Sequence, residues 1–190
     1  MANLIIVFGT QGAGKSSVLQ GLRNNYKIVN VGDEMLERAE KEYGISDRDK
    51  LRTLPNYAEK SEQWRKDILL ELAKGNEPAI IDTHASIKSG NRYTPGLTVE
   101  NLEILKGSTK GILYIDASNE EILKRRANDK TRNREQDTPE EIEQHRNINL
   151  SLASFFSAYL NIPIYVIYNK EGMLEETQNK AKEIAKQLLG

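Results

Sequence analysis

The sequence contains no cysteine. The chain can therefore form no disulfide bond and can hold no metal through thiolates, and proteins of this kind are typical of a reducing compartment. We expect a cytoplasmic protein on this ground.

Long hydrophobic runs and an excess of one charge are also missing. The first apolar run, residues 4–8, is far shorter than the roughly 20 residues of a membrane span, and no basic segment precedes it, so we expect no membrane association. The 27 basic and 28 acidic residues give a net charge of -1. No overall field favours nucleic acid, and we expect none as a partner. A chain of 190 residues is most simply one domain.

Short apolar runs alternate with stretches of helical pattern along the chain. The runs are residues 4–8, 28–31, 79–81, 112–115 and 164–167. Such runs are typical of strands buried on both faces, and helices between them suit the crossovers of a parallel sheet. We predict an α/β fold with a parallel sheet, and we interpret the polar segment 83–97 as an unusually long loop.

Two helix starts are marked by capping boxes. Ser118 and Thr138 each stand three residues before a glutamate, and Pro139 occupies the first position of the second helix. That helix continues with a mostly apolar stripe, which we interpret as core: Ile142, Asn149, Leu152, Phe156 and Tyr159.

The segment GTQGAGKS, residues 9–16, matches the phosphate-binding pattern G-x-x-x-x-G-K-[ST] and lies between a predicted strand and a predicted helix. Its glycines allow successive backbone N–H groups to face phosphate oxygens. Lys15 would reach the β and γ phosphates of a nucleotide, and the Ser16 hydroxyl would lie near Mg²⁺. A chance glycine-rich turn is the alternative, which the position between strand and helix disfavours.

Two residues after the third apolar run are candidates for the same site. Asp82 ends a predicted strand beside the phosphate loop, where it could influence Mg²⁺ or its water shell, or be an ordinary turn residue. His84 could face a nucleotide or cap the loop. The string NKEG at residues 169–172 ends in glycine, which argues against a guanine-reading switch.

A basic segment, LKRRANDKTRNRE at residues 123–135, separates the two capped helices. Its cations in an otherwise balanced chain indicate an anionic ligand, because guanidinium groups stabilise the charge of a phosphoryl group in transfer. Arg146, on the following helix, could reach the same phosphates. A solvated basic loop is the alternative.

The order of these motifs resembles that of archaeal-type adenylate kinases over nearly the whole chain. The matching segments are GTQGAGKS, NVGDEM (30–35), DRDKLR (47–52), IIDTHASIK (80–88), YTPGL (93–97) and RRANDKTRNRE (125–135). The resemblance implies one nucleoside-monophosphate kinase domain over residues 1–190, with the P-loop kinase fold and a five-stranded parallel sheet flanked by helices. It also implies an acceptor-binding segment at about 32–75, a short basic lid at about 126–138, and a homo-oligomer, frequently a trimer.

The resemblance further implies that the γ-phosphoryl group of Mg-ATP moves to AMP, reversibly giving two ADP. Donor phosphates would be held by Gly9, Thr10, Gln11, Gly12, Ala13, Gly14, Lys15, Ser16 and Ser17, and Mg²⁺ by Ser16 and Asp82. The catalytic cations would be Lys15, Arg126, Arg132, Arg134 and Arg146. The acceptor would contact Gly32, Asp33, Arg48 and Arg52; the two arginines are four residues apart, on one face of a helix, and Arg52 is the better candidate for its phosphate.

The sequence departs from bacterial and eukaryotic adenylate kinases, which carry D-G-[FY]-P-R where this chain has DTHAS. The usual acceptor-phosphate arginine is therefore missing, and His84, Lys88 or Arg92 could replace it. The residues alone leave three other functions open: a P-loop kinase for another monophosphate or an alcohol, a nucleotide-dependent assembly factor with ATPase activity, and a binding module.

We predict that Lys15→Ala and Arg134→Ala each abolish phosphoryl transfer without unfolding the protein, because both side chains would act on phosphate charge rather than in the core. Steady-state kinetics with circular dichroism as the folding control would test this. A variant that keeps near-normal turnover would remove its residue from the catalytic set.

Overall fold

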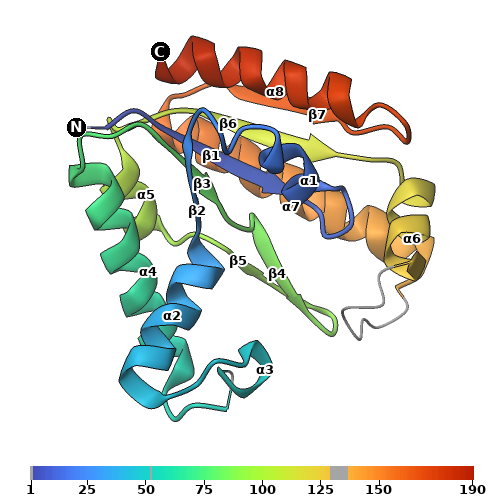
Figure 1. Cartoon of the computed structure of the whole chain (residues 1–190). Helices are drawn as coiled ribbons and strands as arrows, with labels where there is room; N and C mark the ends of the chain where they lie inside the picture. Colours follow the sequence, from blue (N-terminus) through green and yellow to red (C-terminus); the bar gives the residue numbers. More distant parts are fainter. Residues whose placement is uncertain (1, 52, 129–136) are drawn as a thin grey trace.

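The centre of the fold is a five-stranded parallel sheet with the strand order β2-β3-β1-β6-β7 (Figure 1). The computed structural model describes residues 2–51, 53–128 and 137–190. The strands are β1 (Leu4–Gly9), β2 (Lys27–Asn30), β3 (Ala79–Asp82), β6 (Thr109–Asp116) and β7 (Ile164–Tyr168). Their pairings are all parallel, so the predicted sheet is confirmed.

Helices cover both faces of the sheet, which explains why every residue of β1 is buried. Leu4, Ile6 and Phe8 belong to the core on the side of α4 (Tyr57–Lys74), α5 (Val99–Leu105) and α7 (Pro139–Leu160). Ile5 and Val7 pack on the other side, with α1 (Lys15–Gln20) and α8 (Leu174–Leu189). The alternation follows from the two-residue period of a strand.

Both predicted helix starts are present. In front of α6 (Asn119–Asn128), the Glu121 N–H donates to Ser118 Oγ over 3.2 Å, and the Ser118 N–H donates to the Glu121 carboxylate over 3.0 Å. Thr138 and Glu141 form the same reciprocal pair in front of α7, with Pro139 as its first residue. The stripe that continues α7 contributes Ile142 and Phe156 to the core, as predicted.

The prediction of a long loop over residues 83–97 is wrong for the central part of this segment. These residues form an antiparallel hairpin, β4 (Ser86–Ser89) with β5 (Arg92–Pro95), paired from Ser86 opposite Pro95 to Ser89 opposite Arg92. The hairpin is a separate two-stranded sheet and packs against α7 (Figure 1). The sequence did not reveal it because each strand has only four residues, mostly polar, whereas the prediction relied on buried apolar runs.

Helices α2 (Val31–Tyr43), α3 (Arg48–Leu51) and α4 form the part of the molecule below the sheet in Figure 1, and they span most of the predicted acceptor-binding segment. Strand β2 ends one residue earlier than expected, because Val31 already begins α2. The Asn30 side chain caps this helix by accepting the Asp33 N–H over 3.0 Å.

In the predicted lid, residues 129–136 lie outside the described part of the chain. None of the described helices is long and apolar enough to cross a membrane.

We predict that Gly96→Ala destabilises the protein by about 1–3 kcal/mol, because a Cβ at this position would overlap the backbone carbonyl of His84 at the base of the hairpin. Gly90→Asn is the control: Gly90 has a φ of 56°, which asparagine tolerates, and a Cβ there meets no atom within 4 Å. Urea unfolding would compare the two variants. Equal losses of unfolding free energy would contradict the predicted overlap.

Candidate active site

The phosphate loop connects the end of β1 to the start of α1, as the motif predicts. Gly12 and Gly14 have φ angles of 94° and 86°, in the left-handed region that favours glycine. A Cβ on Gly14 would overlap the Asn169 side chain, and one on Gly9 would lie 2.6 Å from the Ile115 carbonyl oxygen. The loop therefore needs its glycines both for its conformation and for its close packing, and a chance turn is not a sufficient explanation.

Side chains from distant segments hold the backbone carbonyls of this loop. The Ala13 oxygen accepts hydrogen bonds from Arg125 Nη1 over 3.1 Å and from Asn169 Nδ2 over 2.9 Å. The Gln11 oxygen accepts two bonds from Arg126, at 2.9 and 2.7 Å. These bonds hold the two carbonyl oxygens towards the arginine and asparagine side chains. The backbone N–H groups of the loop can then face bound phosphate.

Sequence reasoning missed the roles of Arg125 and Asn169. Arg125 was one of several cations in the basic segment, and Asn169 was considered only as part of a possible guanine motif. The Arg125 guanidinium also donates to the backbone oxygen of Asn169 over 2.7 Å. Only the fold brings the two residues to one carbonyl, so no local signal could have identified them.

Lys15 and Asp82 form an ion pair at the carboxyl ends of β1 and β3. The second Asp82 oxygen accepts a 2.7 Å hydrogen bond from Asn30 Nδ2. The side chains of Lys15 and Asp82 are 11% and 7% exposed, so this pair is well shielded from water. Charge pairing is stronger at low exposure than in water, and this pair joins the phosphate loop to the end of β3.

The donor set around the loop fits Mg²⁺ bound together with phosphates. Ser16 at the start of α1 and Asp82 supply oxygen atoms, which Mg²⁺ prefers. Among the described residues no group of three His, Asp or Glu side chains could hold a metal on its own.

A cavity of about 590 Å³ joins the phosphate loop to the start of α2. Its lining brings together predicted donor and acceptor residues, among them Lys15, Ser16, Gly32, Asp33, Asp82 and His84. The volume lies within the usual range for small-molecule sites. The predicted residues from both halves of the reaction thus share one space.

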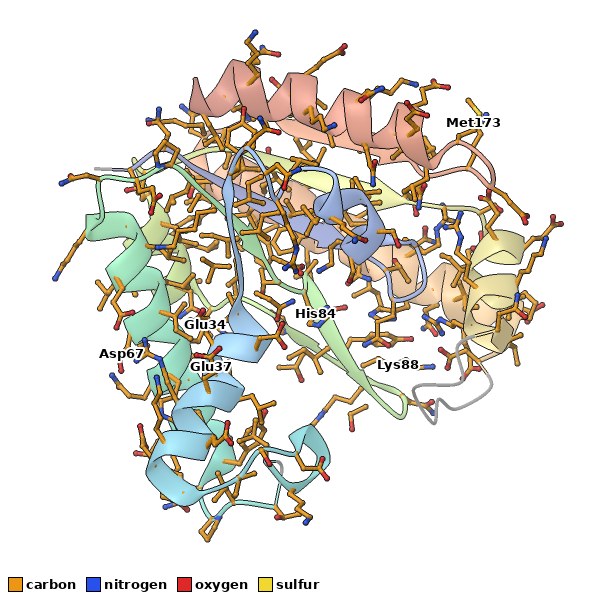
Figure 2. All side chains as sticks on the ribbon, in the orientation of Figure 1. Glu34, Glu37, Asp67, His84, Lys88 and Met173 are labelled. Carbon is orange, nitrogen blue, oxygen red and sulfur yellow. The ribbon has the colours of Figure 1, made fainter. Side chains whose placement is uncertain are left out.

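Lys88 and Arg92, the other two candidates for the acceptor phosphate, do not belong to this lining. In Figure 2, His84 lies at the base of the hairpin and Lys88 lies farther along it. Lys88 Nζ donates to Asp137 over 2.5 Å and lies 3.5 Å from the Glu141 carboxylate. Arg92 is exposed at the start of β5.

Asp137 binds two cations of the predicted site. One of its oxygens accepts from Lys88 and the other from Arg126. Burial alone would raise the pKa of Asp137, but the hydrogen bonds and charges of these two partners outweigh it and hold the pKa below its usual value. The carboxylate is therefore ionised at neutral pH and links α6 to the hairpin.

Arg146 of α7 binds Asp116, the buried last residue of β6, through two hydrogen bonds of 2.9 and 2.6 Å. A third bond of 2.8 Å goes to Asn119. The bond to Asp116 raises the pKa of Arg146, so its charge is permanent. Its role toward phosphate stays a prediction.

The remaining predicted arginines are Arg48, Arg52, Arg132 and Arg134. Arg48 is the first residue of α3. Arg52, Arg132 and Arg134 lie outside the described residues, so their roles also stay predictions.

Comparison with known proteins identifies relatives over nearly the whole chain. Residues 8–143 match a family model described as an AAA domain. The chain is 36% identical to adenylate kinase of Pyrococcus horikoshii, with 97% of this chain and 95% of the relative covered. It is 33% identical to adenylate kinase of Pyrococcus abyssi, with the same two coverages.

Among solved structures, shikimate kinase of Bacteroides thetaiotaomicron superposes with a TM-score of 0.60 at 15% identity, with 97% of this chain and 98% of that chain covered. At this identity the likeness concerns the fold alone, and it supports the P-loop kinase fold. The sequence identities and coverages of the two adenylate kinases show the family as well as the fold. The chain belongs to the archaeal-type adenylate kinase family.

Proposed function

We propose that the protein transfers the γ-phosphoryl group of ATP to AMP and, in reverse, forms ATP and AMP from two ADP. Family membership supports this reaction. The observation that carries it is the shared cavity, because its wall includes both the phosphate loop and the predicted acceptor residues Gly32, Asp33 and His84. Transfer without a covalent intermediate needs both substrates in one such space.

The donor half of the reaction depends on the phosphate loop and on Lys15. The loop N–H groups and the lysine would hold the donor phosphates, with Lys15 exchanging Asp82 for phosphate oxygens. Mg²⁺ at Ser16 and Asp82 would neutralise phosphate charge. Arginines aimed at the moving group are worth about 10³ to 10⁵ in rate. Among the predicted arginines that the structure describes, Arg126 contacts the phosphate loop at Gln11, although it does not line the cavity.

The acceptor half needs no strong general base. The attacking atom is a phosphate oxygen of AMP, which is ionised near neutral pH, so positioning and electrostatics carry the reaction. Of the three candidates for binding the acceptor phosphate, His84 is the one in the cavity wall. We therefore assign that contact to His84 in preference to Lys88 and Arg92.

Three further properties are part of the proposal. Membership of the adenylate kinase family supports the use of Mg-ATP, and the cysteine-free composition agrees with a cytoplasmic location. Association of the chain into a trimer rests on the family resemblance described above.

His84→Ala is expected to raise the KM for AMP by about tenfold or more, because a hydrogen bond to a charged phosphate is lost. The KM for ATP should stay within about twofold of the wild type. Arg92→Ala provides the comparison on the same hairpin and should change neither constant by more than about twofold. Initial rates with each substrate varied in turn would decide the assignment. An unchanged KM for AMP in His84→Ala, or an increase confined to Arg92→Ala, would move the contact away from His84.

The function itself is tested with purified protein, Mg²⁺ and ADP as the only nucleotide. Because one ADP must act as donor and another as acceptor, equal amounts of ATP and AMP should appear over time in chromatograms. A protein that binds Mg-ATP and forms neither product would contradict the proposal. A panel of other monophosphates, and ATP hydrolysis with protein or RNA partners, would then separate the remaining functions.

A further inference from the structure

A buried chain of hydrogen bonds connects the phosphate loop to the hairpin through one side chain of α7. Asn149 Nδ2 donates to Thr10 Oγ1, in the phosphate loop, over 3.2 Å. Asn149 Oδ1 accepts the Ser86 N–H over 3.0 Å and the Ser86 hydroxyl over 2.6 Å, in β4. The three residues are 2–4% exposed. A single amide group therefore spans the distance between the donor loop and the hairpin.

The hydrogen positions in this chain follow from its partners. Ser86 uses its only hydroxyl hydrogen on Asn149, so His145 Nε2, which lies 3.1 Å from Ser86 Oγ, must be the donor of that bond. Thr10 Oγ1 also lies 3.1 Å from the Tyr114 hydroxyl, and burial raises the pKa of Tyr114 to about 12, so the phenol keeps its proton. The direction of each bond that Asn149 makes is thus fixed, and the amide cannot be flipped without placing donor against donor.

The hairpin is also held along the same face of α7. Glu141, His145 and Asn149 are spaced four residues apart on this helix, and each contacts the hairpin. The His145 ring packs against the Tyr93 ring of β5 in a tilted arrangement, with the ring centroids 5.3 Å apart and an angle of 51° between the ring planes. Both strands of the hairpin are therefore attached to α7, and β4 is in turn tied to the phosphate loop through Asn149.

This arrangement bears on the reaction because the linked residues flank the reacting groups. Ser86 is two residues from His84, which lines the cavity, and Thr10 belongs to the loop that ends in Lys15 and Ser16. We propose that Asn149 is a positioning residue that sets the spacing between the donor loop and the acceptor hairpin, so that phosphoryl transfer depends on it more than the binding of either substrate does. The inference rests on the proposed function.

Apolar side chains could fill the same volume, and they would spare the cost of burying polar groups. Apolar contacts are not directional, however, and would let the two segments slide relative to each other. Hydrogen bonds with fixed donors and acceptors define one spacing. Because a displacement of about 1 Å between reacting groups can cost about 100-fold in rate, a directional link between these segments has a direct kinetic effect.

The test compares Asn149→Ala with the wild type. The expected result is a loss of kcat of at least about tenfold. The Kd of Mg-ATP and the Kd of AMP, each measured alone by titration calorimetry, should stay within about threefold of the wild-type values. Asn101→Ala is the matched control. Asn101 is a fully buried asparagine that bonds to Thr98 and Glu62, away from the phosphate loop, and its removal should leave kcat within about twofold.

Several outcomes overturn the inference. An unchanged kcat in Asn149→Ala would contradict it. Equal losses of kcat in the two asparagine variants would also contradict it, because they would indicate a general effect of stability.

If Asn149→Ala does not fold, Ser86→Ala tests the same link, since it removes one of the two bonds to Asn149 Oδ1. In that variant kcat should fall several-fold, and an unchanged kcat would contradict the proposal. A wild-type protein that forms no ATP from ADP would overturn the proposed function, and this inference with it.

Discussion

The burial of β1 on both faces is the constraint on which the rest of the site depends. The strand lies at the centre of the sheet, and helices cover it on either side, so its last residue is fixed in space. Gly9 is that residue, and the phosphate loop begins there. Since the neighbouring strands β3 and β6 run parallel to β1, their carboxyl ends bring Asp82 and Asp116 to the same edge. The position of the cavity is therefore a consequence of core packing.

Several cations near this edge are paired with carboxylates before any substrate binds. Lys15 pairs with Asp82, and Lys88 and Arg126 share Asp137. A bound phosphate must compete with these carboxylates for the cations. Its binding free energy is therefore the difference between the cation–phosphate and the cation–carboxylate interactions, and not the full strength of the first. The pair with Asp82 also holds the Lys15 side chain in the cavity wall, which reduces the entropy that this side chain loses when phosphate binds.

Sequence patterns predicted the parts of the structure that obey local rules. The five strands, the phosphate loop and the capping boxes at Ser118 and Thr138 follow from apolar runs, glycine spacing and short-range hydrogen bonds, and the structure confirms them. The hairpin was not predicted, because its strands are short and polar. For Arg52, Arg132 and Arg134, sequence remains the basis of the assignment.

Long-range partners could not be predicted from one sequence. The bond between Arg125 and Ala13 joins residues 112 positions apart, and the bond between Asn149 and Thr10 joins residues 139 apart. Neither asparagine nor arginine carries a local mark of such a role. On the α7 stripe, Asn149 looked like a polar exception in a core-facing pattern, and its significance appears only when the hairpin is placed beside it.

The hairpin has one more property, which concerns how the protein can change over evolution. It forms its own two-stranded sheet and shares no ladder of backbone hydrogen bonds with the five-stranded one. It is attached to side chains of α7 by Lys88, Tyr93 and Ser86, the last through both its hydroxyl and its backbone N–H. Substitutions in this unit can therefore change the proposed acceptor side while the five-stranded sheet keeps every one of its strand pairings. The exposed positions of the hairpin, such as Ile87 and Arg92, are therefore free to vary in sequence without loss of a strand pairing in the main sheet.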